Sequence, residues 1–192
     1  MSNENLFEAL EVEEQRQVQP NPKSKKLLTM ALVIGLCVGL DQLTKIVARQ
    51  KLTSAGTISH FGDLFRWHYS ENHGAFLSLG ANLPEETRFW IFNVLVTVIL
   101  IGILWSIIAG PDDRPHTLIT YSLVAGGGFS NLLDRFLNDG AVIDFMNVGL
   151  GNLRTGIFNL ADMAITGGVI MLILFSFPLG GEEKADQDSE RG

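Results

Sequence analysis

Cysteine is almost absent from this sequence, and the common metal and phosphate motifs are missing too. The chain of 192 residues has one cysteine, Cys37, so it forms no internal disulfide and has no paired-cysteine metal site. It contains neither a glycine-rich phosphate loop nor an H-E-x-x-H zinc motif. The formal net charge is −7, and no basic aromatic patch occurs. We therefore expect no metal site and no nucleic-acid partner.

Long apolar runs take the place of these motifs. Hydrophobic residues make up 46% of the chain, and four stretches approach the roughly 20 residues that cross a bilayer. We place these spans at about 27–48, 89–109, 116–137 and 157–179. The third is diluted by glycine and serine, which are common where membrane helices pack closely. The sequence predicts an all-α integral membrane protein with four transmembrane helices.

The charged ends flank one membrane domain. Residues 1–26 form an acidic tail with a basic end next to the membrane, and residues 180–192 form a second acidic tail. We expect both tails to be disordered and residues 27–179 to form a single domain. The first span is too long for a cleaved signal sequence and lacks a small-residue cleavage site, so we expect the chain to retain it.

The loop between the first two spans, residues 49–88, contains two strand-like segments. Residues 57–61 and 64–69 alternate in part and are rich in β-formers around Gly62 and Asp63. This pattern predicts a small extracytoplasmic β-hairpin lying over the membrane surface.

Charged residues inside the apolar runs are the strongest functional signal, because such positions are costly. Successive spans alternate in direction, so the end of the first, the end of the third and the start of the fourth lie on one side of the membrane. The polar residues that this brings together are Asp41, Lys45, Asn131, Asp134, Arg135, Asn159 and Asp162. Chance would not favour such a convergence.

Basic residues before the first span set the orientation. Lys23, Lys25 and Lys26 favour a cytoplasmic N-terminus, so both termini are expected inside and the polar cluster outside. The charge signal is mixed. Five basic residues fall in loops assigned to the outside, namely Arg49, Lys51, Arg66, Arg88 and Arg154, against Arg114 and Lys184 inside.

Each of these residues also has a purely structural interpretation. Asp41 and Lys45, four apart on a helix, could form an ion pair with Lys45 reaching toward water. Asp134 and Arg135 could form a surface charge pair, and Asp162 could cap the fourth helix. Gly127, on the same face as Asn131, could serve helix packing alone.

Asp144 lies just outside the membrane between the apolar residues Ile143 and Phe145, and these neighbours are poorly explained if Asp144 is an ordinary solvent-exposed loop residue. If the chain returns across the same face, Asp144 and Asp162 approach each other at the water–lipid boundary. Two carboxylates that share a site keep one proton between them and titrate as a unit. Such a pair supplies both an acid and a base for peptide hydrolysis and requires no cofactor.

Other functions are compatible with parts of this pattern. An ion or solute transporter would use intramembrane carboxylates, but the cytoplasmic halves of the spans carry no matching ionisable residues. A scaffold that assembles through the glycine-rich helix leaves Asp144 and Asp162 unexplained. A serine–histidine dyad lacks a histidine on a later span, and the glycine-x-glycine-aspartate signature of presenilin-like proteases is absent.

Ordered motifs along residues 27–179 carry a family resemblance. They are D-Q-L-T-K at 41–45, N-H-G-A-F at 72–76, G-G-F-S-N-L-L-D-R at 127–135, V-I-D-F at 142–145 and F-N-L-A-D at 158–162. On these motifs the chain resembles the bacterial lipoprotein signal peptidases, also called type II signal peptidases. The sequence departs from many members of this family in two places. It lacks a second alanine before Phe76, and it has Ser130 where many members have glycine. Both departures bear on substrate preference.

The resemblance implies a monomeric four-helix aspartic peptidase of the bacterial cytoplasmic membrane, working among membrane lipids. It would cut signal peptides from diacylglyceryl-modified prolipoproteins at the outer face, just before the lipidated cysteine. By the same resemblance Asp144 and Asp162 are the catalytic pair. The residues expected to bind substrate or support the site are Asp41, Lys45, Asn72, Gly127, Asn131, Asp134, Arg135 and Asn159.

Overall fold

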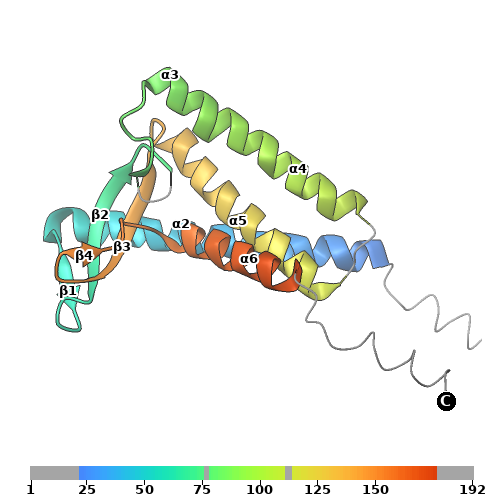
Figure 1. Cartoon of the computed structure of the whole chain (residues 1–192), viewed down its shortest axis with the longest axis horizontal. Helices are drawn as coiled ribbons and strands as arrows, with labels where there is room; N and C mark the ends of the chain where they lie inside the picture. The colour runs from blue at the N-terminus through green and yellow to red at the C-terminus, as the bar shows by residue number, and fades with distance from the viewer. Residues whose placement is uncertain (1–21, 76–77, 111–113, 177–192) are drawn as a thin grey trace, which may run out of the picture.

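The computed structural model describes residues 22–75, 78–110 and 114–176, and long helices dominate it (Figure 1). These helices alternate in direction, and a small sheet lies at one end of them. Their bounds are α2 Pro22–Ala55, α3 Glu85–Arg88, η2 Phe89–Leu95, α4 Val96–Ala109, α5 Pro115–Leu137 and α6 Leu160–Ser176. The elements from α3 to α4 follow one another without a break. Most of both acidic tails, as well as Phe76, falls outside the described residues.

Helix α5 is the centre of the bundle, since it packs against α2, α4 and α6. Its three consecutive glycines each face a different helix. A Cβ atom would lie 2.7 Å from Cys37 of α2 at Gly126, 2.4 Å from the Ala161 carbonyl oxygen of α6 at Gly127, and 2.6 Å from Leu100 of α4 at Gly128. This close packing accounts for the low hydropathy of the third apolar stretch, because small residues let helix backbones approach.

The outer helices present apolar surface. Among the described residues, two helices, Lys23–Ala55 and Glu85–Ala109, are long and apolar enough to cross a membrane by length and composition, and Leu160–Ser176 is a shorter apolar helix. Leu32, Leu36 and Leu40 form an exposed stripe along α2. An apolar stripe of this length on an outer face is typical of a surface that contacts lipid or another protein.

The sheet has four antiparallel strands in the order β1-β2-β3-β4. They are β1 Ile58–His60, β2 Phe65–Asn72, β3 Val142–Leu150 and β4 Leu153–Arg154. The predicted hairpin is present as β1 and β2. The sequence did not reveal that β2 also pairs with β3, from Phe65 opposite Val148 to Asn72 opposite Val142. The all-α prediction is therefore corrected to a helical bundle that carries a four-stranded sheet.

Two helices also differ in their bounds from the expected spans. Helix α2 begins before Leu27 and continues beyond Ala48 to Ala55 because Ala48 and Leu52 pack under the sheet against Phe145 and Met146. Helix α6 begins at Leu160 rather than at residue 157, because the backbone of Phe158 still bonds to Met146 of β3.

Candidate active site

A buried cluster of polar side chains lies where the sheet meets α2, α5 and α6. The structure brings together all of the site residues predicted from the sequence. Asp41, Lys45, Asp134 and Asp144 are each 1% exposed or less, and Asn72, Asn131, Asn159 and Asp162 are 8% exposed or less. Buried polar groups at this density require partners, since an unpaired one is costly.

Lys45 is the cation of the cluster. Its ammonium nitrogen lies 2.6 Å from a carboxylate oxygen of Asp41 and 2.8 Å from one of Asp134. It also donates a hydrogen bond of 3.0 Å to the side-chain oxygen of Asn131. The predicted ion pair of Asp41 and Lys45 is confirmed, whereas Lys45 does not reach toward water.

The alternative surface pair of Asp134 and Arg135 is wrong. Close packing of α2 on α5 turns Asp134 inward to Lys45, while the guanidinium of Arg135 donates to the Gly74 carbonyl oxygen at 2.8 Å and to the Asn131 carbonyl oxygen at 3.4 Å. Arg135 also lies over the ring of Phe92, 5.5 Å from its centroid.

Asp41 and Asp134 fix the two segments that carry the predicted catalytic pair. Asp41 accepts a hydrogen bond of 2.9 Å from the backbone nitrogen of Ala161, the residue before Asp162. Asp134 accepts one of 2.9 Å from the backbone nitrogen of Ile143, the residue before Asp144. Each buried aspartate therefore holds the backbone next to one member of the pair.

Two further members of the cluster were not predicted. The hydroxyl of Ser130 donates to Asp41 at 2.7 Å, and the amide of Gln42 donates to Asp134 at 2.7 Å and to the Ser130 hydroxyl at 3.0 Å. The available signal was helical spacing, because Ser130 lies four residues before Asp134. Gln42, adjacent to Asp41, offered no such signal.

Asp144 projects from β3, and two side-chain amides donate to its carboxylate. One carboxylate oxygen accepts 2.9 Å from the side-chain nitrogen of Asn72, and the other accepts 2.7 Å from that of Asn159. The side-chain oxygen of Asn72 accepts from the Gly74 nitrogen at 2.8 Å, which fixes the direction of the amide. Burial and the negative charge of Asp162 raise the pKa of Asp144 to about 7.

Asp162 lies in the first turn of α6. Its carboxylate accepts 2.8 Å from the side-chain nitrogen of Asn131 and 3.2 Å from the backbone nitrogen of Asn159. Asn159 returns the contact, because its side-chain oxygen accepts from the Asp162 nitrogen at 2.9 Å. This reciprocal pattern is a capping box, so the structural role expected for Asp162 is also present.

Two amides connect the two aspartates. The side-chain nitrogen of Asn159 donates to the side-chain oxygen of Asn131 at 3.0 Å and also to the carboxylate of Asp144. The side-chain nitrogen of Asn131 in turn donates to the carboxylate of Asp162. Within the described ranges, no group of three or more His, Cys, Asp or Glu residues could hold a metal ion. The arrangement presents two carboxylates that are each held by neutral amide donors and are linked to one another through Asn131 and Asn159.

An apolar groove of about 400 Å³ leads to Asp162 from between the helices. Its polar wall is formed by Asn131, Arg135, Asp162 and Thr166. Its apolar wall includes Phe92, Val96, Ile165, Val169 and Ile170. This geometry gives an apolar ligand a route to a carboxylate that is otherwise buried.

A family model described as signal peptidase (SPase) II matches residues 33–178. The chain belongs to the signal peptidase II family. Membership implies a hydrolase that cuts peptide bonds. The chain is 31% identical to a lipoprotein signal peptidase of Mycolicibacterium smegmatis, over 90% of this chain and 72% of that protein. It is 34% identical to one from Brevibacillus brevis, over 76% of this chain and 93% of that protein.

Solved structures agree with this membership. Two structures described as a bacterial membrane enzyme superpose with TM-scores of 0.66 and 0.65, at 25% and 26% identity. The first comparison covers 81% of this chain and 93% of the other, and the second covers 79% and 94%. The bundle and its small sheet are therefore shared with membrane enzymes.

Proposed function

We propose that this chain is an aspartic endopeptidase that removes the signal peptide from diacylglyceryl-modified prolipoproteins, cutting just before the lipidated cysteine. The observation that carries this proposal is the joining of Asp144 and Asp162 through the amides of Asn131 and Asn159. The names of the relatives support the class of substrate, and the apolar groove at Asp162 suits a lipidated one.

The reaction follows from one proton shared by two carboxylates. The raised pKa of Asp144 keeps a proton on the pair near neutral pH. The ionised carboxylate takes a proton from a water molecule, and the oxygen of that water attacks the scissile carbonyl carbon. At the same time the protonated carboxyl donates its proton to the carbonyl oxygen. Collapse of the tetrahedral intermediate then breaks the C–N bond, and a proton passes to the leaving amine.

The surrounding residues have positioning roles in this proposal. Asn72, Asn131 and Asn159 donate to the carboxylates and set their orientation, as the hydrogen bonds indicate. Asp41, Lys45 and Asp134 hold the backbone before each aspartate, and Gly127 lets α6 approach α5. Arg135 lines the groove and contacts the substrate. No cofactor takes part.

We also propose that α2, the unit from α3 to α4, α5 and α6 each cross the bacterial cytoplasmic membrane. The alternating helix directions support this topology, as do the exposed apolar faces of the outer helices. The lysines before the first apolar stretch then keep both termini in the cytoplasm. The sheet and the paired aspartates would face outward, and the enzyme would work as a monomer among membrane lipids.

The test is cleavage of a diacylglyceryl-modified prolipoprotein by the purified protein in detergent, followed by a shift in gel mobility. The matched substrate is the same prolipoprotein without its lipid. Lipid-dependent cleavage is the expected result. Equal cleavage of both substrates would contradict the proposed specificity, and no cleavage by folded protein would contradict the proposed reaction.

A further inference from the structure

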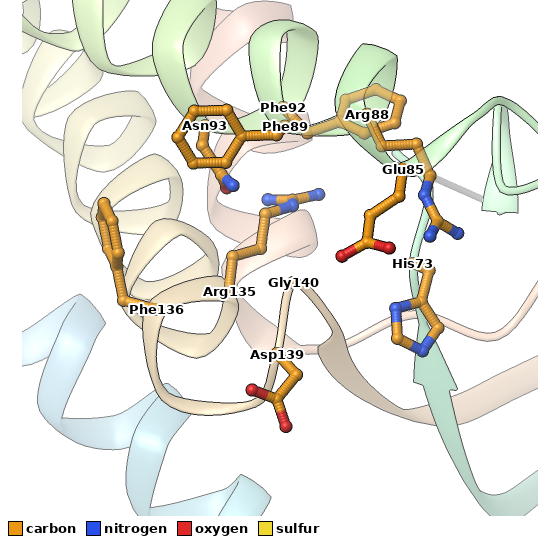
Figure 2. A pocket seen from close by; sticks show the side chains of 10 residues that line it. All are labelled: His73, Glu85, Arg88, Phe89, Phe92, Asn93, Arg135, Phe136, Asp139 and Gly140. Carbon is orange, nitrogen blue, oxygen red and sulfur yellow. The ribbon is translucent and has the colours of Figure 1, made fainter.

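A second hollow adjoins the apolar groove, and both are lined by Phe92 and Arg135. This outer pocket, of about 200 Å³, lies between η2 and the turn that follows α5 (Figure 2). Its other polar residues are His73, Glu85, Arg88, Asn93 and Asp139. A chain that leaves the apolar groove past Arg135 would therefore enter a polar pocket.

Two buried polar atoms in this pocket have no hydrogen-bond partner among the described residues. They are the side-chain oxygen of Asn93 and the Nε atom of Arg135, whose other nitrogens donate to Gly74 and Asn131. Figure 2 shows the Asn93 amide and the Arg135 guanidinium directed into the same space. Unpaired buried polar atoms in a native protein call for a ligand or a water molecule.

The two atoms have complementary chemistry. Arg135 Nε can only donate, and the Asn93 oxygen can only accept. A peptide group matches both, because its carbonyl accepts and its N–H donates. An ester or a phosphate offers acceptors alone and would leave the Asn93 oxygen unpaired. Asn93 belongs to the π-helix η2, a backbone form that is frequent at functional sites.

We propose that the outer pocket binds the extended part of the mature chain that follows the lipid-modified cysteine, with one of its peptide groups bonded to Asn93 and Arg135. This inference rests on the proposed function. Acyl chains and the signal peptide are apolar and suit the groove, whereas the mature chain is polar and must lead away from the membrane. Recognition of backbone rather than side chains would let one pocket accept many mature sequences.

The experiment compares two diacylglyceryl-modified peptides. One ends as an amide directly after the cysteine, and the other continues for several residues. We expect the wild type to have a KM about threefold to tenfold lower for the longer peptide, the range of one or two hydrogen bonds. Asn93→Ala is expected to remove most of this advantage. Asn82→Ala, which truncates an exposed asparagine in the turn before α3, is the matched control and is expected to retain it.

A second arm removes the donor from the substrate. N-methylation is scanned over the peptide groups that follow the cysteine. At the recognised group, methylation is expected to raise the KM of the wild type but not that of Asn93→Ala, because paired changes to one contact do not add. Asn93→Ser serves as the second variant if Asn93→Ala does not fold.

The outcomes separate the two proposals. Equal KM values for the two peptides with the wild type would overturn the outer-pocket assignment and leave the peptidase proposal intact. An undiminished advantage in a folded Asn93 variant would also overturn it. Cleavage of neither peptide by folded wild type would overturn the proposed function and this inference together.

Discussion

Replacement of Lys45 by methionine tests the buried charge network. The ammonium group lies 2.6 Å from Asp41 and 2.8 Å from Asp134, with all three side chains at most 2% exposed. Methionine keeps an unbranched apolar side chain and leaves two buried carboxylates without their cation. Loss of one partner from a buried ion pair costs about 3–5 kcal/mol. At about 2–4 °C per kcal/mol for a chain of this size, the melting temperature should fall by roughly 6–20 °C.

The assay is thermal unfolding in detergent micelles, followed by the loss of helical circular dichroism. Lys51→Met on the same helix is the matched control, because Lys51 is exposed, and its effect should stay within about 0.5 kcal/mol. Addition of Asp41→Asn and Asp134→Asn to Lys45→Met should restore much of the lost stability, since the two carboxylates that paired with Lys45 are then neutral amides. Unfolding of Lys45→Met at the temperature of the Lys51→Met control would refute the network.

Four further predictions concern packing and protonation. Gly127→Ala places a Cβ atom 2.4 Å from a carbonyl oxygen of α6 and should cost about 1–3 kcal/mol in thermal unfolding, whereas Gly39→Ala meets nothing within 4 Å and should not. In a pH series, kcat/KM should fall as pH rises through about 7, because Asp144 then loses its proton. That pKa lies above the 3.8 of a free carboxyl, so the folded state favours protonated Asp144. The contribution of Asp144 to the free energy of unfolding should therefore be present below about pH 4 and lost as the pH rises from about 4 to 7. Asn72→Ala removes a hydrogen bond that lowers the pKa of Asp144, so the alkaline limb of its pH profile should move to higher pH.

Much of the site was predictable, because its residues stand at the ends of apolar stretches. The alternation of helix directions alone brings Asp41, Asn131 and Asp162 to one end. The helical spacing of Asp41 and Lys45 predicted their ion pair, which is confirmed. These are local signals, and one sequence is enough to read them.

The features that could not be predicted from the sequence depend on contacts between distant segments. Asp134 pairs with Lys45 rather than Arg135 because α2 packs against α5, a choice that local spacing cannot express. Strand β3 became visible only through its partner β2, because Asp144 and Asn147 interrupt its apolar pattern. Asn93 gave no signal, since its position over the outer pocket depends on the π-helical turn of η2.

The catalytic role of the two aspartates is tested most directly by the cleavage rates of Asp144→Asn and Asp162→Asn on a diacylglyceryl-modified prolipoprotein, beside wild type and with a check that each variant is folded. We expect both variants to lose turnover, because an amide cannot exchange the shared proton, and we expect chelators to leave the wild-type rate unchanged. Turnover close to wild type in either folded variant would contradict the aspartic pair.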